Sequence, residues 1–252
     1  MRIFKKPIFM FVLGLIIAGS IGVIAVNLSA NDISYGNGTV KDALDELYTS
    51  SRGVSCLYLS GTKGQVGSKY ICDPGDGVAR NFYILKVDTD EVKLIMERNL
   101  SDEIGNVKTM SYSDANSFIS NNNINTSWKN AKSVSLPSIQ DIANAGGITG
   151  WDVTTATTSN WSYFGVNSQN DTSNRSNYIW LYDYTRECSS YECTNSLSSS
   201  YAYGYWSNDL IQNDSTRAWN VFRGGYIGYD TKTIDTHYGV RPVITMEKTQ
   251  LN

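Results

Sequence analysis

Histidine, cysteine and positive charge are scarce in this sequence. Its 252 residues include one histidine and four cysteines, and the formal net charge is −3. A protein that binds nucleic acid normally presents a basic patch, so this charge balance gives a nucleic-acid partner no support. The cysteines lack the C-x2-C spacing of structural zinc sites, and His237 is the only imidazole that could join them. We therefore expect neither a nucleic-acid partner nor a bound metal.

Sequence motifs that accompany catalysis are also absent. The chain has no P-loop, no dinucleotide-binding glycine loop and no G-x-S-x-G elbow. His237 follows Asp235 by two residues, so a serine–histidine–aspartate set is arithmetically possible, but a lone histidine beside a tyrosine is more often structural. Paired carboxylates for glycoside cleavage cannot be recognised in a single sequence. We expect no catalytic residue and no cofactor.

The longest uncharged run lies at the N-terminus and indicates insertion into a membrane. Cations at positions 2, 5 and 6 precede about nineteen apolar or small residues from Ile8 to Val26, close to the ~20 that a helix needs to cross a hydrocarbon core. Cations before such a run place the N-terminus in the cytoplasm and the remainder outside. We predict a single-pass, uncleaved anchor within residues 1–30, embedded through residues 8–26. The alternative is a cleaved signal peptide that ends near Ala30 and leaves a secreted protein.

Residues 31–52 are predicted to form a linker followed by a short amphipathic helix. Val40, Ala43, Leu44 and Leu47 recur at the spacing of one helical face. Thr39 can cap this helix, which would span residues 39–48. Its apolar face could pack on the following domain or pair with a second copy of the chain.

The remaining part of the chain, residues 53–252, is rich in aromatic and small polar residues. The whole sequence has 17 tyrosines, six tryptophans and seven phenylalanines, and in this part they alternate with asparagine, serine, threonine and glycine. This composition is typical of short strands and long ordered loops. It also resembles the composition of binding loops, in which rigid rings supply contact area. The alternative is a secreted domain, largely of strands, whose rings belong to the core.

Local patterns predict a hairpin, two short helices and several strands. The hairpin joins Asn81–Val87 to Val92–Met96, because apolar residues alternate on both sides of an Asp88–Asp90 turn. The helices are Ser113–Ile119, with Ser113 as its cap, and Ser138–Ala145, which Gly146 and Gly147 end. Further strands are expected at Tyr203–Ser207, Ala218–Phe222, Tyr226–Tyr229 and Gly239–Met246. Between Thr149 and Ser200 we expect loops with short strands.

The four cysteines all lie beyond the predicted anchor. Cys56 and Cys72 flank a glycine-rich stretch, and Cys188 and Cys193 flank four residues. Four cysteines allow three pairings, of which local pairing is the simplest. A Cys56–Cys72 bridge would close a loop of about 15 residues and stabilise the fold by ~3 kcal/mol. Export favours oxidation, so we expect disulfides rather than zinc.

Four segments carry a family resemblance. They are Ser135–Gly147, Tyr205–Ser207, Ala218–Gly225 and Tyr238–Val243. In this order they resemble the C-type-lectin-like fold of the formylglycine-generating (sulfatase-modifying) proteins, which many bacterial surface domains share. The resemblance covers about residues 80–246. It implies an α+β domain with short strands, one or two helices and long loops.

The matching residues read as framework rather than as a binding site. They are Leu136, Pro137, Gly146, Gly147, Trp206, Trp219, Arg241 and Pro242. Leu-Pro fixes the first turn of a helix and paired glycines end it, while the tryptophans are large enough to fill a core. Arg241 lies in an apolar strand, so we expect it to pair with a carboxylate or with carbonyl groups.

Departures from the family bear on function. Its oxygen-dependent members hold copper with a late cysteine pair, whereas no cysteine follows Trp206 here. The related sugar-binding lectins hold Ca²⁺ with Glu-Pro-Asn and Trp-Asn-Asp motifs. The first is missing, and only Trp206–Asp209 is faintly similar to the second. A copper-dependent enzyme and a calcium-dependent sugar site are therefore not expected.

From the sequence we expect a membrane-anchored surface domain for adhesion or recognition of a glycan or protein ligand. The loops of Trp151–Tyr205 would make the contacts, through the candidates Trp161, Tyr163, Trp180, Tyr182, Tyr184 and Tyr191. One alternative is a pilin-like or envelope-assembly subunit that associates through the 39–48 helix. Another is an enzyme of the formylglycine-generating type.

Overall fold

The computed structural model describes residues 34–35, 38–39, 56–100, 109–165, 174–182, 204–235 and 237–252. The chain divides into two units, Met1–Arg52 and Gly53–Asn252. In the first unit, β1 (Ser34–Tyr35) pairs antiparallel with β2 (Gly38–Thr39). The predicted anchor and residues 40–48 of the predicted amphipathic helix lie outside the described residues. Within the described ranges no helix is both long and apolar enough to cross a membrane.

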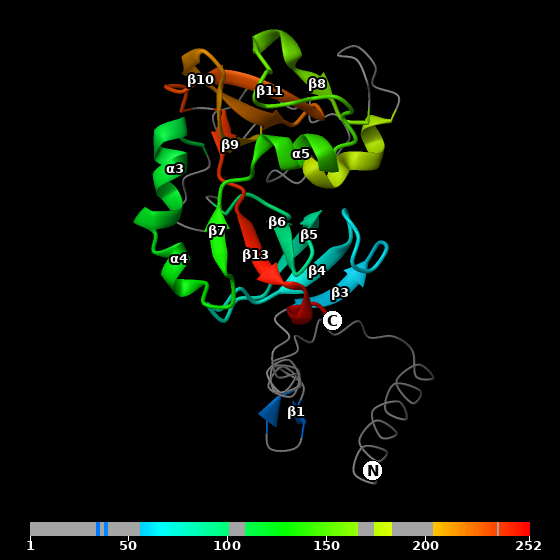
Figure 1. The fold of residues 1–252 in the computed structure, drawn as a ribbon. Helices are drawn as coiled ribbons and strands as arrows, with labels where there is room; N and C mark the ends of the chain where they lie inside the picture. The colour runs from blue at the N-terminus through cyan, green and yellow to red at the C-terminus, as the bar shows by residue number, and fades with distance from the viewer. Residues whose placement is uncertain are drawn as a thin grey trace, which may run out of the picture. The chain divides into compact units, whose positions relative to one another are not determined.

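The second unit is a mixed α+β structure with two sheets and few helices (Figure 1). The six-stranded sheet has, in spatial order, β3 (Cys56–Ser60), β4 (Lys69–Cys72), β5 (Arg80–Val87), β6 (Glu91–Met96), β13 (Val243–Glu247) and β7 (Ser133–Ser135). The five-stranded sheet has β12 (Tyr238–Gly239), β9 (Gly204–Ile211), β10 (Asp214–Phe222), β11 (Tyr226–Thr231) and β8 (Ser162–Tyr163). Neighbouring strands are antiparallel except β12 and β9, which are parallel.

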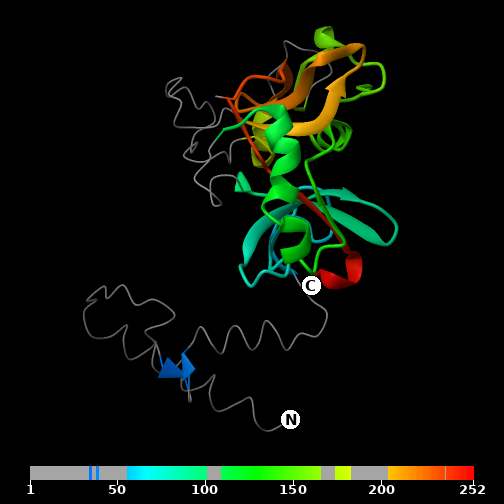
Figure 2. The ribbon, with the colours of Figure 1, turned by 90° about the vertical axis from the view of Figure 1, so that its left-hand side faces the viewer.

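Helices lie beside the two sheets and between them. The α-helices are α3 (Tyr112–Asn121), α4 (Ile124–Ser127) and α5 (Ile139–Ala145). The 3₁₀ segments are η2 (Thr158–Asn160), η3 (Arg175–Leu181) and η4 (Lys248–Gln250). Figures 1 and 2 show α3 and α4 along one side of the two sheets, whereas α5 lies between them and contacts β5 and β9.

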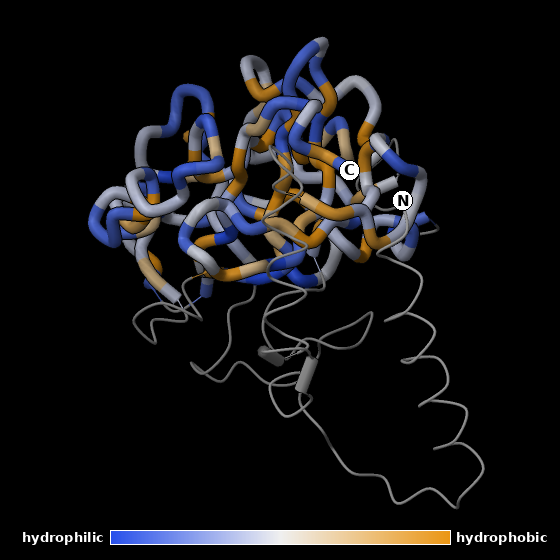
Figure 3. Tube along the Cα trace, turned by 90° about the horizontal axis from the view of Figure 1, so that it is seen from below, coloured by the Kyte–Doolittle hydropathy of each residue, from blue (hydrophilic) through white to orange (hydrophobic). Residues whose placement is uncertain are grey.

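The hairpin of β5 and β6 confirms the clearest prediction from the sequence. Ile84 pairs with Leu94 and Tyr83 with Ile95. Successive side chains of a strand point to opposite faces, so Ile84 joins one buried cluster and Tyr83 the other. Both clusters contain residues of both sheets. In the view of Figure 3, apolar residues gather in the interior of this unit and hydrophilic residues at outer loops.

The two predicted helices form, with one correction. α5 forms where it was predicted, and it begins after Ser138, whose side chain accepts from the amide of Asp141. α3 is capped by Ser111 rather than Ser113, because the Ser111 side chain accepts from the amide of Asp114. This earlier start brings Tyr112 into the first turn, where it is buried.

The strands near the C-terminus differ in extent from the prediction. β9 extends beyond its predicted end to Ile211, and β10 begins before its predicted start, at Asp214. The turn between them contains Asn213, whose φ is 61°. Their outer ends are polar, so the apolar pattern does not reveal them. The predicted strand Gly239–Met246 is two strands, because the chain passes from the five-stranded to the six-stranded sheet at residues 240–242. The glycine-rich stretch near the first cysteines contains β3 and β4, which were not predicted.

Arg241 lies at this crossing and is completely buried. Its guanidinium donates to the carbonyls of Met96, Leu181 and Trp180 at 2.5, 2.8 and 2.6 Å. It also lies 5.1 Å from the ring centre of Tyr205. Burial lowers the pKa of Arg241. The sequence predicted a carboxylate or carbonyl groups as the partners of Arg241, and in the structure its hydrogen bonds go to carbonyl groups.

The Cys56–Cys72 disulfide predicted from the sequence is present. It joins directly opposed residues of β3 and β4, and both cysteines are buried. Cys188 and Cys193 lie outside the described residues. Other framework residues are buried as expected, including Leu136, Pro137, Trp206 and Trp219.

Candidate functional site

One face of the five-stranded sheet contains a hollow of about 360 Å³. In an antiparallel ladder, directly opposed residues project from the same face. The register pairs Asn220 with Gly228 and Phe222 with Tyr226 across β10 and β11, and it pairs Tyr226 with Tyr163 of β8. Because glycine has no side chain, the Asn220–Gly228 pair leaves a gap between larger residues. We call this space the aromatic hollow; it is lined by Trp161, Tyr163, Asn220, Phe222, Tyr226, Gly228, Tyr229, Asp230 and Tyr238.

Aromatic rings support one another along its wall. Trp161 lies 5.6 Å from Tyr163 and 5.7 Å from Tyr226, and Tyr163 lies 5.3 Å from Tyr226, all between ring centres and edge to face. Phe222 stacks on Tyr226 at 4.9 Å. Such ring pairs add stability beyond their buried area. The wall is therefore held in shape by ring–ring contacts.

Polar groups of the tyrosines, Asp230 and Asn220 line the hollow together with the rings. The Tyr238 hydroxyl donates to the Asp230 carboxylate at 3.3 Å. Burial, followed by the Asp230 charge, raises the pKa of Tyr238 well above its usual value. Burial and the neighbouring Tyr163 and Asp230 raise the pKa of Tyr226 to about 12. Both hydroxyls are thus neutral donors at physiological pH.

Asn220 lies at the floor and is fully buried. Neither its Oδ1 nor its Nδ2 makes a hydrogen bond to a described residue. The amide is close enough to the Tyr238 hydroxyl to oppose part of the increase in pKa, but the two groups do not meet the geometry of a hydrogen bond. A buried amide without partners is uncommon in folded proteins.

The structure separates the six aromatic candidates named from the sequence. Trp161 and Tyr163 line the aromatic hollow. Trp180 lies elsewhere, with its ring 5.5 Å from that of Tyr83. Tyr182 is fully buried and stacks on Phe164 at 5.9 Å, so it is a core residue and not the exposed contact that was expected. Tyr184 and Tyr191 lie outside the described residues.

The other residues of the hollow were missed. Asn220, Phe222, Tyr226 and Gly228 alternate along two strands that the sequence did predict, whereas Asp230 lies just beyond the predicted end of the second. Pairing those strands through the Gly224–Gly225 turn would have placed the first four on one face. Tyr163 and Tyr238 lie near these residues only because of the spatial order of the strands. That order cannot be inferred from the pattern of apolar residues.

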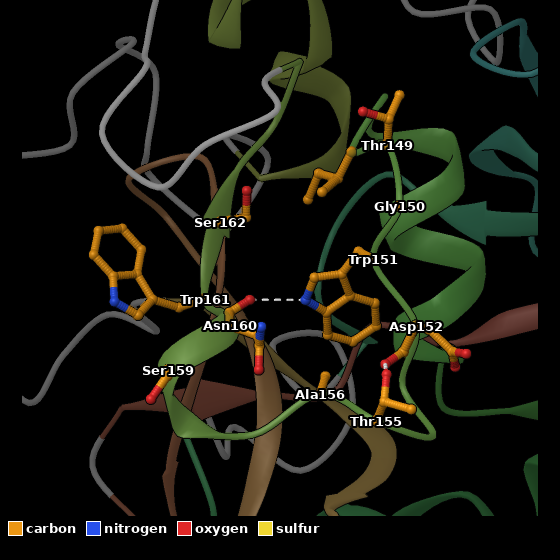
Figure 4. A pocket seen from close by; sticks show the side chains of 11 residues that line it. Thr149, Gly150, Trp151, Asp152, Thr155, Ala156, Ser159, Asn160, Trp161 and Ser162 are labelled. Atoms are coloured by element: carbon orange, nitrogen blue, oxygen red, sulfur yellow. Dashed lines mark hydrogen bonds between the residues drawn. The ribbon is translucent and has the colours of Figure 1, made fainter.

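A second hollow, of about 340 Å³, lies along residues 148–162. Figure 4 shows the ring of Trp151 at its centre and the indole of Trp161 directed away from it. Trp151 Nε1 donates to the carbonyl of Asn160 at 2.8 Å, and Asp152 accepts from the hydroxyl and amide of Thr154. These polar groups are already paired, which makes this hollow the weaker candidate.

The described ranges contain no group of three histidine, cysteine, aspartate or glutamate side chains placed to hold a metal ion. The His237 ring lies 5.9 Å from that of Tyr238.

Comparison with known proteins gives no relative: no family model, curated protein or solved structure matches the chain. The resemblance to C-type-lectin-like domains therefore stays a prediction.

Proposed function

We propose that residues 53–252 form a non-catalytic recognition domain on the outer cell surface, and that the aromatic hollow binds a saccharide. The observation that carries this proposal is a ring-lined space of about 360 Å³ that also holds one carboxylate and one unpaired amide. A sugar ring presents C–H groups on its faces, which pack on aromatic rings, and hydroxyls on its rim, which bond to carboxylates and amides.

The size of the hollow favours one sugar unit over a protein surface. Sites for small molecules are mostly concave, apolar spaces of roughly 300–1,000 Å³ with a few polar groups. A stable protein interface instead buries about 800 Å² on each partner. The hollow, with a volume of about 360 Å³, fits the first description in size, and its lining combines rings with polar groups.

The charges around the hollow disfavour a cationic ligand. The Arg175 guanidinium lies 5.2 Å from the ring centre of Tyr163, and that of Arg223 lies 6.0 Å from Phe222. These cations already lie against two of its rings, where a cationic ligand would otherwise gain attraction. The Asp230 carboxylate supplies an acceptor for hydroxyl groups.

Presentation on the outer surface is part of the proposal. The Cys56–Cys72 disulfide supports it, because such bonds persist in oxidising compartments. The uncharged run of residues 8–26 would anchor the chain in the membrane. The envelope-assembly alternative depends on the 39–48 stretch, which lies mostly outside the described residues.

A glycan array tests the proposal directly. The full chain, in a detergent without a sugar headgroup, should bind at least one glycan saturably, and chelation by EDTA should not change binding. Trp161→Ala should weaken binding at least tenfold, because it removes one wall of the aromatic hollow. Trp180→Ala is the matched control and should not weaken it, since Trp180 packs on Tyr83 instead.

Two results would contradict this account. One is a folded chain that binds no glycan but captures a protein on a parallel array of matrix proteins. The other is glycan binding that disappears with EDTA, which would require a metal-dependent site.

A further inference from the structure

The Asn220 amide is the polar group of the aromatic hollow that the fold leaves without a partner. It lies in the middle of β10, opposite Trp206 of β9 and Gly228 of β11. Its side chain is fully buried, and both its donor and its acceptor lack hydrogen bonds to described residues. Such an amide weakens the folded state unless another molecule supplies partners.

Gly228 keeps space beside this amide. A Cβ at position 228 would lie 3.1 Å from Asn220 Oδ1 and 3.0 Å from Tyr226 Cε2. The backbone of Gly228 is not left-handed, so its conformation does not require glycine. Space is therefore the reason that a side chain is unfavourable here. Since the amide atoms are themselves covered, a ligand reaches them only when side chains that line the hollow shift.

The chemistry of a carboxamide selects among sugar groups. Its oxygen and one of its N–H groups lie side by side. Two hydroxyls on adjacent ring carbons can satisfy both at once, one accepting from Nδ2 and the other donating to Oδ1. An acetamido group cannot, because the N–H and C=O of a trans amide point in opposite directions.

We infer that the aromatic hollow recognises a saccharide unit with two free hydroxyls on adjacent carbons, and that Asn220 binds this pair without a metal ion. The inference rests on the proposed saccharide-binding function and adds the group by which the ligand is selected. Asn220 thereby determines specificity, whereas Trp161 and its neighbouring rings supply contact area.

Methyl glycosides of glucose, mannose and galactose, with their monodeoxy derivatives, test this inference by titration of tryptophan fluorescence in the full chain. For the glycoside that binds, loss of either hydroxyl of one adjacent pair should weaken binding about tenfold. This is the change in the dissociation constant that corresponds to about 1.4 kcal/mol, the size of one hydrogen bond. The variant Asn220→Leu should bind the parent sugar more weakly and should lose this discrimination. The control Asn208→Leu changes an exposed asparagine of β9 and should behave as the unmodified chain.

Gly228→Ala provides a second variant that leaves the amide in place. Its methyl group fills the space beside Asn220, so it should weaken binding of the parent sugar about as much as Asn220→Leu does. If a glycoside binds but every deoxy derivative binds equally well, or if Asn220→Leu keeps the discrimination, the inference is wrong and the proposed function stands. If no glycoside binds the folded chain, the proposed function itself fails.

Discussion

At the scale of single residues, Asn220 and Arg241 show two ways to bury a polar side chain. Arg241 donates to three carbonyls, so its burial is compensated. Asn220 is equally buried, but its amide has no such partners among the described residues. A buried donor or acceptor without a partner costs roughly 1–3 kcal/mol. This contrast is why we assign Asn220 to ligand binding rather than to the framework.

The stability of Asn220→Leu follows from this contrast. Leucine has the same branching at Cγ and no polar atoms, so the change should increase the free energy of unfolding by about 1 kcal/mol. Urea denaturation of the full chain measures the difference. Asn99→Leu is the comparison: Asn99 is also buried and its Oδ1 also lacks a partner among the described residues, but its Nδ2 donates to the Gly204 carbonyl at 3.3 Å, and loss of that hydrogen bond should destabilise the chain. A clear decrease in stability for Asn220→Leu would show that the amide has a structural role.

Sequence reasoning at this scale succeeded where chemistry alone decides the outcome. A cation in an apolar strand must find partners, and Arg241 does. It failed for Tyr182, because a run rich in tyrosine and tryptophan does not reveal which ring becomes buried. Trp161 and Trp180 have similar sequence surroundings, yet only Trp161 lines the aromatic hollow.

At the scale of elements, local signals predicted α5 and the β5–β6 hairpin well. Both have a strong apolar period and clear end signals, Ser138 and Gly146 for the helix and the acidic turn for the hairpin. β3 and β4 were not predicted because they are short and lie in a glycine-rich stretch. The aromatic hollow was not predicted because its residues come from four separate strands and from the turn before β8. Only the spatial order β12-β9-β10-β11-β8 brings their side chains together.

The β3–β4 hairpin should depend on its disulfide. β3 is an edge strand of the six-stranded sheet, and the Cys56–Cys72 bond fixes its register on β4. Replacing both cysteines by alanine should decrease the free energy of unfolding by about 3 kcal/mol, as expected for a loop of about 15 residues. Denaturant titration of the double variant measures this loss. The double variant at Cys188 and Cys193 serves as comparison; a loss confined to that variant would contradict the role given to the first pair.

At the scale of the whole molecule, acid should destabilise the fold through carboxylates whose pKa is lowered in the folded state. Burial alone would raise the pKa of Glu97, but hydrogen bonds from Lys69, Asn81 and Tyr83 outweigh it and lower that pKa below the usual 4.5. The pKa of Asp76 is lowered in the same way, chiefly by Arg80 after burial is counted. Burial raises the pKa of Asp209, which works in the opposite direction.

The sign of the pH dependence follows from Glu97. A carboxylate whose pKa is lower in the folded state stabilises the fold fully above its unfolded pKa, and this stabilisation is lost as the pH falls through the folded pKa. Stability should therefore decrease below about pH 4.5, and Glu97→Gln should flatten this decrease. Denaturation midpoints between pH 3 and 7 give the comparison. A pH profile of Glu97→Gln identical to that of the unmodified chain would contradict the assignment.

The central claim is that a saccharide binds in the aromatic hollow, and the six tryptophans allow one measurement to test it. In the full chain labelled with ¹⁵N-tryptophan, each indole N–H gives its own NMR signal, and Trp161→Phe identifies that of Trp161. Titration with the glycoside that binds should shift the Trp161 signal saturably. The signals of Trp128 and Trp219, which are buried, should not shift. A glycoside that shifts the signal of Trp151 or Trp180 but not that of Trp161 would place the binding site elsewhere and contradict the claim.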